Sequence, residues 1–195
     1  MSDRVLHYFS CGWCPHQPHK AIRYLECMYF FTATILNWQH LLQESKFKQV
    51  IVDSLEWMVK HERAYVYGFV IMPNHFHVLW DFREPFTQDQ IEDAVLKFTG
   101  HQFKNHLRQF DMKLLERYRS TQADREFQFW ERRPYAAEMY TREVAEQKLE
   151  YMHENPCQER WQLATAPENY FFSSARLYVL NKDDFGFITH YAEHI

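Results

Sequence analysis

The sequence contains no apolar run that approaches the roughly 20 residues of a transmembrane helix. Its first residues, MSDRVLHYFSCGWCPH, lack the apolar core of a signal peptide. Only four of the 195 residues are cysteines, too few and too scattered for the disulfide framework of a secreted protein. We also find no internal repeat and no low-complexity tract. These absences argue against membrane and secreted proteins, and we expect a cytoplasmic one.

The composition indicates a folded chain, because 46% of the residues are hydrophobic and 18% are aromatic. The length suits one domain with appended segments. We assign an N-terminal arm to residues 1–26, the domain to 27–180 and a C-terminal tail to 181–195. The arm contains Cys11, Cys14, His16 and His19. Zinc modules usually separate their ligand pairs by a longer loop, so we expect a flexible arm here rather than a structural zinc site.

Charge is distributed unevenly along the chain. The net charge is -4, yet residues 97–133 contain nine Lys and Arg against five Asp and Glu. This segment therefore carries +4, and the remainder carries -8. A basic middle is typical of a phosphate-facing surface, but it also fits a solvated helix face, and charge alone does not decide between them.

Hydrophobic periodicity predicts seven elements. In chain order they are a strand at 27–37, a helix at 45–61, strands at 64–72 and 75–82, a helix at 88–115, a strand at 127–130 that extends to 135–139, and a helix at 141–155. The first six have the order of a ferredoxin-like or RRM-like α+β fold, an antiparallel sheet with helices on one face. The last helix is an addition at the C-terminal side.

Individual residues mark the helix ends. Ser45 and Thr141 are candidate N-caps of their helices, and Pro156 brings the last helix to an end. Gly100 is a possible weak point of the long helix.

Two histidines, His75 and His77, stand one residue apart in the strand HFHVLWDF. Alternate residues of a strand share a face, so the two imidazoles point the same way, while Phe76, Val78 and Trp80 face a packed core. Two neutral imidazoles on one face form half of a site for a first-row metal. Solubility or hydrogen bonding would also explain such a pair, so support from elsewhere in the chain is needed.

The last helix supplies candidates for the second half of the site. Tyr151 and Asn155 are four residues apart and therefore lie on one helix face. Pro156 disfavours helical geometry at Asn155, so we expect that residue at a loosened helix end, turned toward a ligand.

Three blocks of sequence resemble the REP-associated tyrosine transposases, members of the HUH superfamily of single-tyrosine transposases of single-stranded DNA. They are FVIMPNHFHVLW, FWERRPYAAEMYTREVAEQKLEYMHENP and PENYFFSSARLY. The resemblance extends from about Tyr29 to Tyr178. The strand motif is matched from Pro73 to His77, and the helix motif from Tyr151 to Pro156. The acidic net charge and the CGWCPHQPH arm depart from the family pattern.

The resemblance implies a set of roles for these residues. His75 and His77 are metal ligands, Tyr151 is the nucleophile, and Asn155 is a third ligand, with His153 and Glu154 as the alternatives to it. Mg²⁺ or Mn²⁺ is the implied cofactor, and Mn²⁺ suits imidazole ligands at least as well. The implied activity is transposase or endonuclease chemistry near hairpin repeats, through a phosphotyrosine and without a nucleotide cofactor.

The implied partner is single-stranded or hairpin DNA, bound by a monomer or a homodimer. The candidate DNA-binding residues are basic and belong to the middle of the chain: Lys97, Lys104, Arg108, Arg132 and Arg133. Unpaired bases can stack on exposed aromatic rings, for which Trp130 and Tyr135 are candidates. Two alternatives remain. One is a DNA- or RNA-binding protein of this fold without the catalysis, and the other is a metal-dependent phosphodiesterase in which a water attacks.

Overall fold

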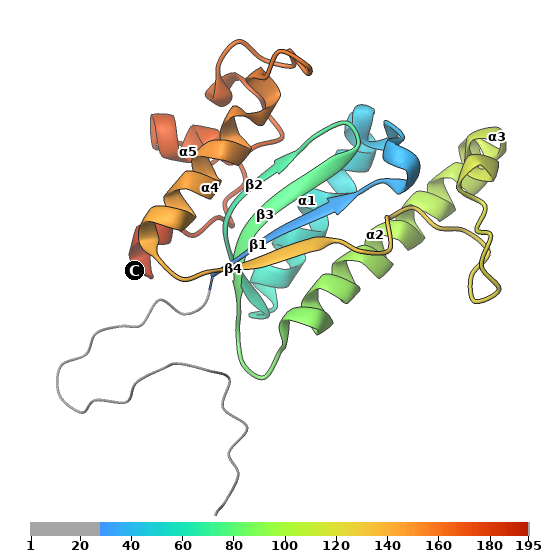
Figure 1. The fold of residues 1–195 in the computed structure, drawn as a ribbon, viewed down its shortest axis with the longest axis horizontal. Coiled ribbons are helices and arrows are strands. Elements are labelled where there is room, and N and C mark those ends of the chain that lie inside the picture. Colours follow the sequence, from blue (N-terminus) through green and yellow to red (C-terminus); the bar gives the residue numbers. More distant parts are fainter. Residues whose placement is uncertain (1–27, 195) are drawn as a thin grey trace, which may run out of the picture.

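The computed structural model describes residues 28–194, which form a four-stranded antiparallel sheet with helices (Figure 1). The strands are β1 (Met28–Thr34), β2 (Ala64–Ile71), β3 (His75–Phe82) and β4 (Tyr135–Met139), in the spatial order β2-β3-β1-β4. This is the strand order of a ferredoxin-like α+β fold, so the predicted fold class is confirmed.

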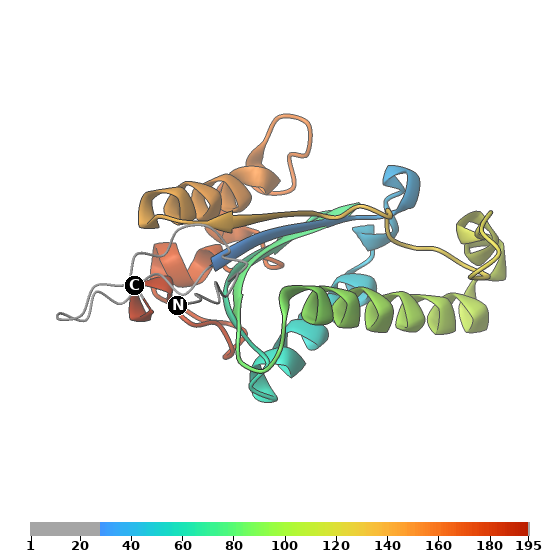
Figure 2. The ribbon, with the colours of Figure 1, turned by 60° about the horizontal axis from the view of Figure 1, so that its bottom comes forward.

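Helices cover the two faces of the sheet unequally. The helices α1 (Ser45–Lys60) and α2 (Gln88–Phe110) lie against one face, and α4 (Arg142–Glu154) lies on the other (Figure 2). Shorter elements connect them: η1 (Leu36–Trp38), η2 (Leu41–Gln43), α3 (Met112–Leu115), η3 (Glu116–Tyr118), η4 (Asn155–Cys157), η5 (Pro167–Asn169), α5 (Ala175–Leu180) and η6 (Tyr191–Glu193). Both faces of the sheet are therefore covered.

Alternation along β3 divides its side chains between two cores. Phe76, Val78 and Trp80 are fully buried in the larger core, which lies under α1 and α2. The opposite face of β3 carries His75 and His77, followed by Leu79 in the smaller core that α4 covers. The predicted separation of histidines from core residues is confirmed.

Close packing of α4 on the sheet depends on Gly68 of β2. A Cβ at this position would lie 2.6 Å from Leu149 Cδ2 and 2.6 Å from Met152 Cε, both on α4. Real Cβ atoms do not approach other atoms so closely, so a side chain at this position would force the ends of these two flexible side chains to move.

Two predictions about helix ends were wrong. Ser45 is the first residue of α1 and not its cap, since Glu44 occupies the cap position without a side-chain bond. The long helix breaks at Asp111, whose carboxylate accepts from Leu114 N–H at 2.8 Å and caps α3. It does not break at Gly100, because one helical glycine costs only about 1 kcal/mol, which tertiary packing outweighs.

The prediction of a strand at 127–130 was also wrong, since none of β1 to β4 includes these residues. Phe127 and Trp130 each form an isolated bridge, and the rings of Phe129 and Trp130 pack against Phe103 of α2. The aromatic residues that suggested a strand are needed for the core. Only the extension at 135–139 forms a strand, β4. The cap at Thr141 is confirmed, since its hydroxyl accepts from Val144 N–H.

The structure describes the predicted C-terminal tail up to residue 194, but not the predicted N-terminal arm. Cys11, Cys14, His16 and His19 lie outside the described residues. Residues 181–194, assigned to a tail, pack on the domain: Phe187 is buried in the larger core, and Thr189 N–H donates to Val66 O. None of the helices between 28 and 194 has the length and apolar character that crossing a bilayer requires.

Candidate active site

The imidazoles of His75 and His77 lie side by side on β3. Their ring centroids are 4.8 Å apart, and each side chain is about 95% buried. β3 pairs with β1 in a register that places Thr34 opposite His75 and Thr32 opposite His77. The sheet therefore brings the two rings together on the face that α4 partly covers.

One nitrogen of each imidazole is held by a neighbouring oxygen. Nδ1 of His75 lies 2.6 Å from Oδ1 of Asn74, and Nδ1 of His77 lies 2.7 Å from Oγ1 of Thr32. An amide oxygen accepts, so Nδ1 of His75 carries the proton and its Nε2 lone pair is free. Such partners fix the ring orientation of histidines that bind metals.

Both imidazoles are neutral at neutral pH. Burial lowers the pKa of His75 to about 4, and the positive charge of Arg160 adds to this effect. Burial also lowers the pKa of His77 well below its ordinary value, with further contributions from His75, Lys148 and Arg160. Metal coordination requires the neutral ring, so these groups need lose no proton on binding a cation.

The side chains fit a divalent cation. Nε2 of His77 is buried and has no hydrogen-bond partner, which is costly for a polar atom unless a ligand satisfies it. Residues 28–194 contain no group of three or more His, Cys, Asp and Glu that could hold a metal ion. A cation bound by the two imidazoles would therefore take its other ligands from an amide, water or substrate.

Tyr151 lies on α4 above this pair. Its side chain is 50% exposed, and its ring centroid is 5.7 Å from that of His77. The ring also packs edge-on against Phe30, at 6.4 Å. The structure thus brings Tyr151 and the histidines together while leaving the tyrosine open to solvent.

Asn155 is hydrogen-bonded to Arg160. It is fully buried, and its Oδ1 accepts a 3.4 Å hydrogen bond from Arg160, while its Nδ2 has no partner. Among the hydrogen bonds of the described residues, none links Asn155 to His75 or His77. Asn155 is the C-cap of α4, so the α-helix ends at the predicted place, but Asn155 keeps helical angles (φ -54°, ψ -44°) and the chain continues into η4 through Pro156. The preference against helix before proline is not absolute.

The two substitutes for Asn155 have different environments. Nε2 of His153 lies 2.7 Å from Oγ of Ser174, and its ring packs against Tyr178, in the direction of α5. Glu154 is exposed to solvent.

Four residues of this neighbourhood were missed at the level of sequence. Thr32 comes from a strand 45 residues before His77, and only the strand register shows that they meet. Trp161 packs against His75 at 5.8 Å, and Arg160 lies beside it. Lys148 is one turn before Tyr151, with its Nζ 5.7 Å from the tyrosine ring centroid. Of these four residues, only Lys148 could have been found from sequence, because it lies three residues before Tyr151 on the same predicted helix.

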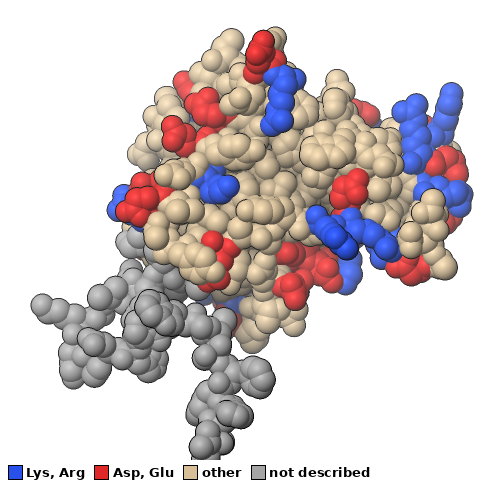
Figure 3. Space-filling model, viewed as in Figure 1, with Lys and Arg blue, Asp and Glu red and all other residues tan. Residues whose placement is uncertain are grey.

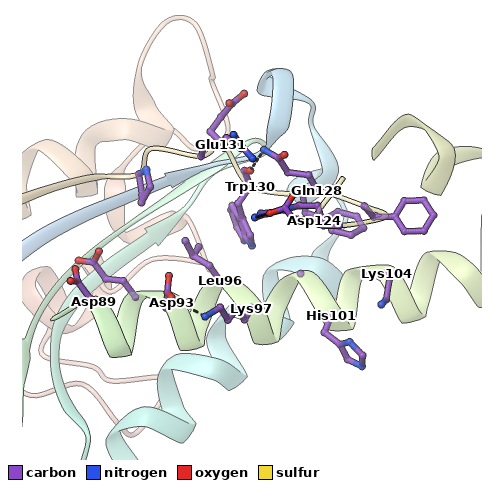
Figure 4. Close-up of a pocket in the computed structure, with 17 residues that line it drawn as sticks. Asp89, Asp93, Leu96, Lys97, His101, Lys104, Asp124, Gln128, Trp130 and Glu131 are labelled. Atoms are coloured by element: carbon purple, nitrogen blue, oxygen red, sulfur yellow. Dashed lines mark hydrogen bonds and ion pairs between the residues drawn. The ribbon is translucent and has the colours of Figure 1, made fainter. Parts of the chain in front are cut away.

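The predicted basic residues lie mostly away from this site. Lys97, Lys104 and Arg132 line a groove between α2 and the segment that leads to β4 (Figure 4). Lys97 pairs with Asp93 at 2.8 Å, and Arg108 pairs with Glu126 at 3.5 Å. Figure 3 shows Lys and Arg gathered toward the end of the molecule formed by α2 and α3, with acidic side chains among them.

The two candidate stacking residues have different environments. Trp130 is buried, and its indole N–H donates to Oγ1 of Thr99 at 3.0 Å. It is a core residue. Tyr135 of β4 is 55% exposed and is available for contact with a ligand.

Comparison with known proteins shows a likeness of fold. No family model and no curated protein matches the sequence. Among solved structures, a REP-associated tyrosine transposase bound to a REP hairpin matches with a TM-score of 0.58 and 14% identity, over 89% of this chain and 92% of that chain. The chain therefore has a transposase-like fold, and at this identity the likeness concerns the fold alone.

Proposed function

We propose that this protein cleaves and rejoins single-stranded DNA near hairpin repeats, through attack of Tyr151 on a phosphodiester with a divalent cation at His75 and His77. The observation that carries the proposal is the position of the Tyr151 ring, 5.7 Å from the ring of His77, whose Nε2 is buried without a partner. A phenol open to solvent and a pair of neutral imidazoles are the parts that such chemistry needs.

Each residue has a separate part in this scheme. The phenol oxygen of Tyr151 attacks phosphorus in line, which yields a phosphotyrosine and a free 3′-hydroxyl and keeps the phosphodiester energy for rejoining. His75 and His77 would hold the cation, and Asn74 and Thr32 orient their rings. When bound, Mg²⁺ or Mn²⁺ would stabilise charge on the phosphate oxygens. Asn155 is the proposed third ligand, and its Oδ1 also accepts the hydrogen bond from Arg160.

Hairpin DNA is the proposed partner. The neighbour of the same fold is described as bound to a REP hairpin. In the described part of the chain Lys104, Arg132 and Arg133 form no close ion pair, and Arg132 interacts only at longer range with Asp124, which pairs with Arg125, so these cations can contact phosphate. We propose a monomer or a homodimer as the active form.

A nucleic-acid-binding protein without catalysis is the second candidate. It is favoured by the absence, within residues 28–194, of a cluster of three metal-ligating His, Cys, Asp or Glu side chains. It is favoured also by the bond that holds Asn155 to Arg160. This candidate predicts DNA binding that is indifferent to divalent cations and no cleavage.

The histidines test the proposal. Purified protein, a labelled single strand with a hairpin, and Mn²⁺ or Mg²⁺ should give cleavage, and EDTA should abolish it. His75→Ala with His77→Ala should abolish cleavage while circular dichroism and much of the DNA affinity are retained. His153→Ala is the matched control, since this buried histidine bonds Ser174 and not the pair. Cleavage at the wild-type rate by the folded double variant would overturn the proposal.

A further inference from the structure

The ring of Phe30 on β1 contacts four side chains of the candidate site. It stacks on His77 at 5.2 Å and 25°, and it meets Tyr135 and Tyr151 edge-on, each at 6.4 Å. Nζ of Lys148 lies 5.1 Å from its centroid. Phe30 itself is 2% exposed. One buried ring thus holds the imidazole, both tyrosines and the lysine in a fixed arrangement.

Tyr135 occupies the outer strand of this arrangement. The register pairs Tyr135 with Thr32, and Thr32 with His77, so the three side chains lie in a row on one face of the sheet. Tyr135 is supported by Phe30 on one side and is 55% exposed. An exposed aromatic ring held in place in this manner is a platform on which an unpaired base can stack.

Lys148 adds a positive charge beside the platform. Its Nζ lies over both Phe30 and Tyr151, and in the described part of the chain it forms no ion pair with a carboxylate. The side chain is partly buried in a protein of net charge -4. A partly buried cation without an acidic partner, next to a candidate nucleophile, is suited to bind an anion.

We propose that Tyr135 and Lys148 form a subsite for one nucleotide of single-stranded DNA beside Tyr151. The base stacks on the Tyr135 ring, and the adjoining phosphate contacts the Lys148 ammonium. The proposal deepens the proposed function and rests on it for the identity of the strand. A stacked base inside a duplex is covered on both faces, so the subsite accepts an unpaired nucleotide and tolerates any base.

The test measures binding without cleavage, in EDTA. The probe is a hairpin with a single-stranded flank in which 2-aminopurine, or an abasic residue, is placed at each flank position in turn. One flank position should show 2-aminopurine quenching with the wild-type protein. Tyr135→Ala should lose that quenching and bind the flank on the order of 10- to 100-fold more weakly, the range expected for one stacked base. Tyr135→Phe should behave as wild type.

Two further variants separate stacking from general effects. Tyr140→Ala removes a more exposed tyrosine, directly after β4, and should change neither affinity nor quenching. Lys148→Gln should weaken binding. It should also reduce the slope of the logarithm of the binding constant against the logarithm of the salt concentration by about 0.7, the value for one phosphate contact on a single strand. An abasic residue at the quenched position should make wild type and Tyr135→Ala bind alike.

Several results would overturn the subsite. The first is an unchanged affinity of Tyr135→Ala for the probe. The second is an affinity of Tyr135→Ala that stays below that of the wild type wherever the abasic residue is placed. The third is that the wild-type protein does not bind the flank. These outcomes are distinct from failure of the proposed function, since the assay needs neither metal nor cleavage. Conversely, adduct formation on Tyr151 that is unaffected by Tyr135→Ala would leave the function standing and refute the subsite.

Discussion

Thr32 Oγ1 lies 2.7 Å from Nδ1 of His77, and this contact joins β1 to β3 at the centre of the candidate site. It holds the ring so that Nε2, the nitrogen without a partner, is left for a ligand. The opposite member of the pair, His75, has its own oxygen in Asn74. Two histidines of one strand therefore depend on different neighbours for their orientation.

Removing the Thr32 hydroxyl should weaken metal binding. Thr32→Val keeps the side-chain shape but leaves Nδ1 of His77 without its partner, and loss of such support typically costs 10- to 100-fold in metal affinity. Calorimetric titration with Mn²⁺ checks this. Thr34→Val, on the same strand and opposite His75, is the matched control and should bind Mn²⁺ as the wild type does. Equal affinities for both variants would contradict the role of Thr32.

The basic residues should contribute unequally to DNA affinity. Arg132→Glu with Arg133→Glu should weaken hairpin binding by about tenfold or more and flatten its salt dependence, since each phosphate contact releases counterions. Lys97→Glu with Arg108→Glu should cost less, because these cations already pair with Asp93 and Glu126. Titration at several fixed ionic strengths compares the two pairs. If neither pair matters, the groove and its surroundings are only a solvated surface.

Glu92 should make stability depend on pH. Burial of Glu92 on α2 raises its pKa from 4.5 to about 7, and Asp89 and Asp93 add to this, while a hydrogen bond from Gln88 opposes it. The folded protein holds this proton more tightly than the unfolded chain. The contribution of protonated Glu92 to the free energy of unfolding is therefore complete below about pH 4.5 and is lost as pH rises toward about 7.

The variant Glu92→Gln should remove that dependence. At pH 8 it should melt about 2–4 °C above the wild type, the shift for about 1 kcal/mol in a domain of this size, after allowance for solvent screening. Near pH 4.5 the two proteins should melt together. A difference of the same size at both pH values would show that ionisation of Glu92 is not its cause.

Much of the fold could be predicted because its signals are local. Alternation in HFHVLWDF separates the histidines from Phe76, Val78 and Trp80 without knowledge of any partner strand. The Thr141 cap is likewise contained within four residues. The segment at 127–130 was misread because β propensity and core packing favour the same aromatic residues, and only the tertiary contacts of Phe129 and Trp130 distinguish them.

Only those site residues that belong to local motifs could be predicted from the sequence. The shared face of His75 and His77 follows from strand geometry, and Tyr151 follows from its motif. Thr32 depends on a register between distant strands, which the sequence does not specify residue by residue. The environment of Asn155, buried at the start of η4 with its amide bonded to Arg160, is a tertiary feature that helical spacing does not give. Helical spacing places Tyr151 and Asn155 on one face, but it does not say which of them meets solvent.

The central claim is that Tyr151 is the nucleophile, and the most direct measurement is its covalent adduct with DNA. Tyr151→Phe removes one oxygen and keeps the ring that packs on Phe30, so the fold and the imidazole pair should be retained. Wild-type protein with Mn²⁺ or Mg²⁺ and a labelled hairpin strand should give a denaturation-resistant adduct that maps to Tyr151 by mass spectrometry. Tyr151→Phe should give neither adduct nor cleaved strand. Undiminished cleavage by this variant, as expected if a water attacks, or an adduct on another tyrosine, would contradict the account.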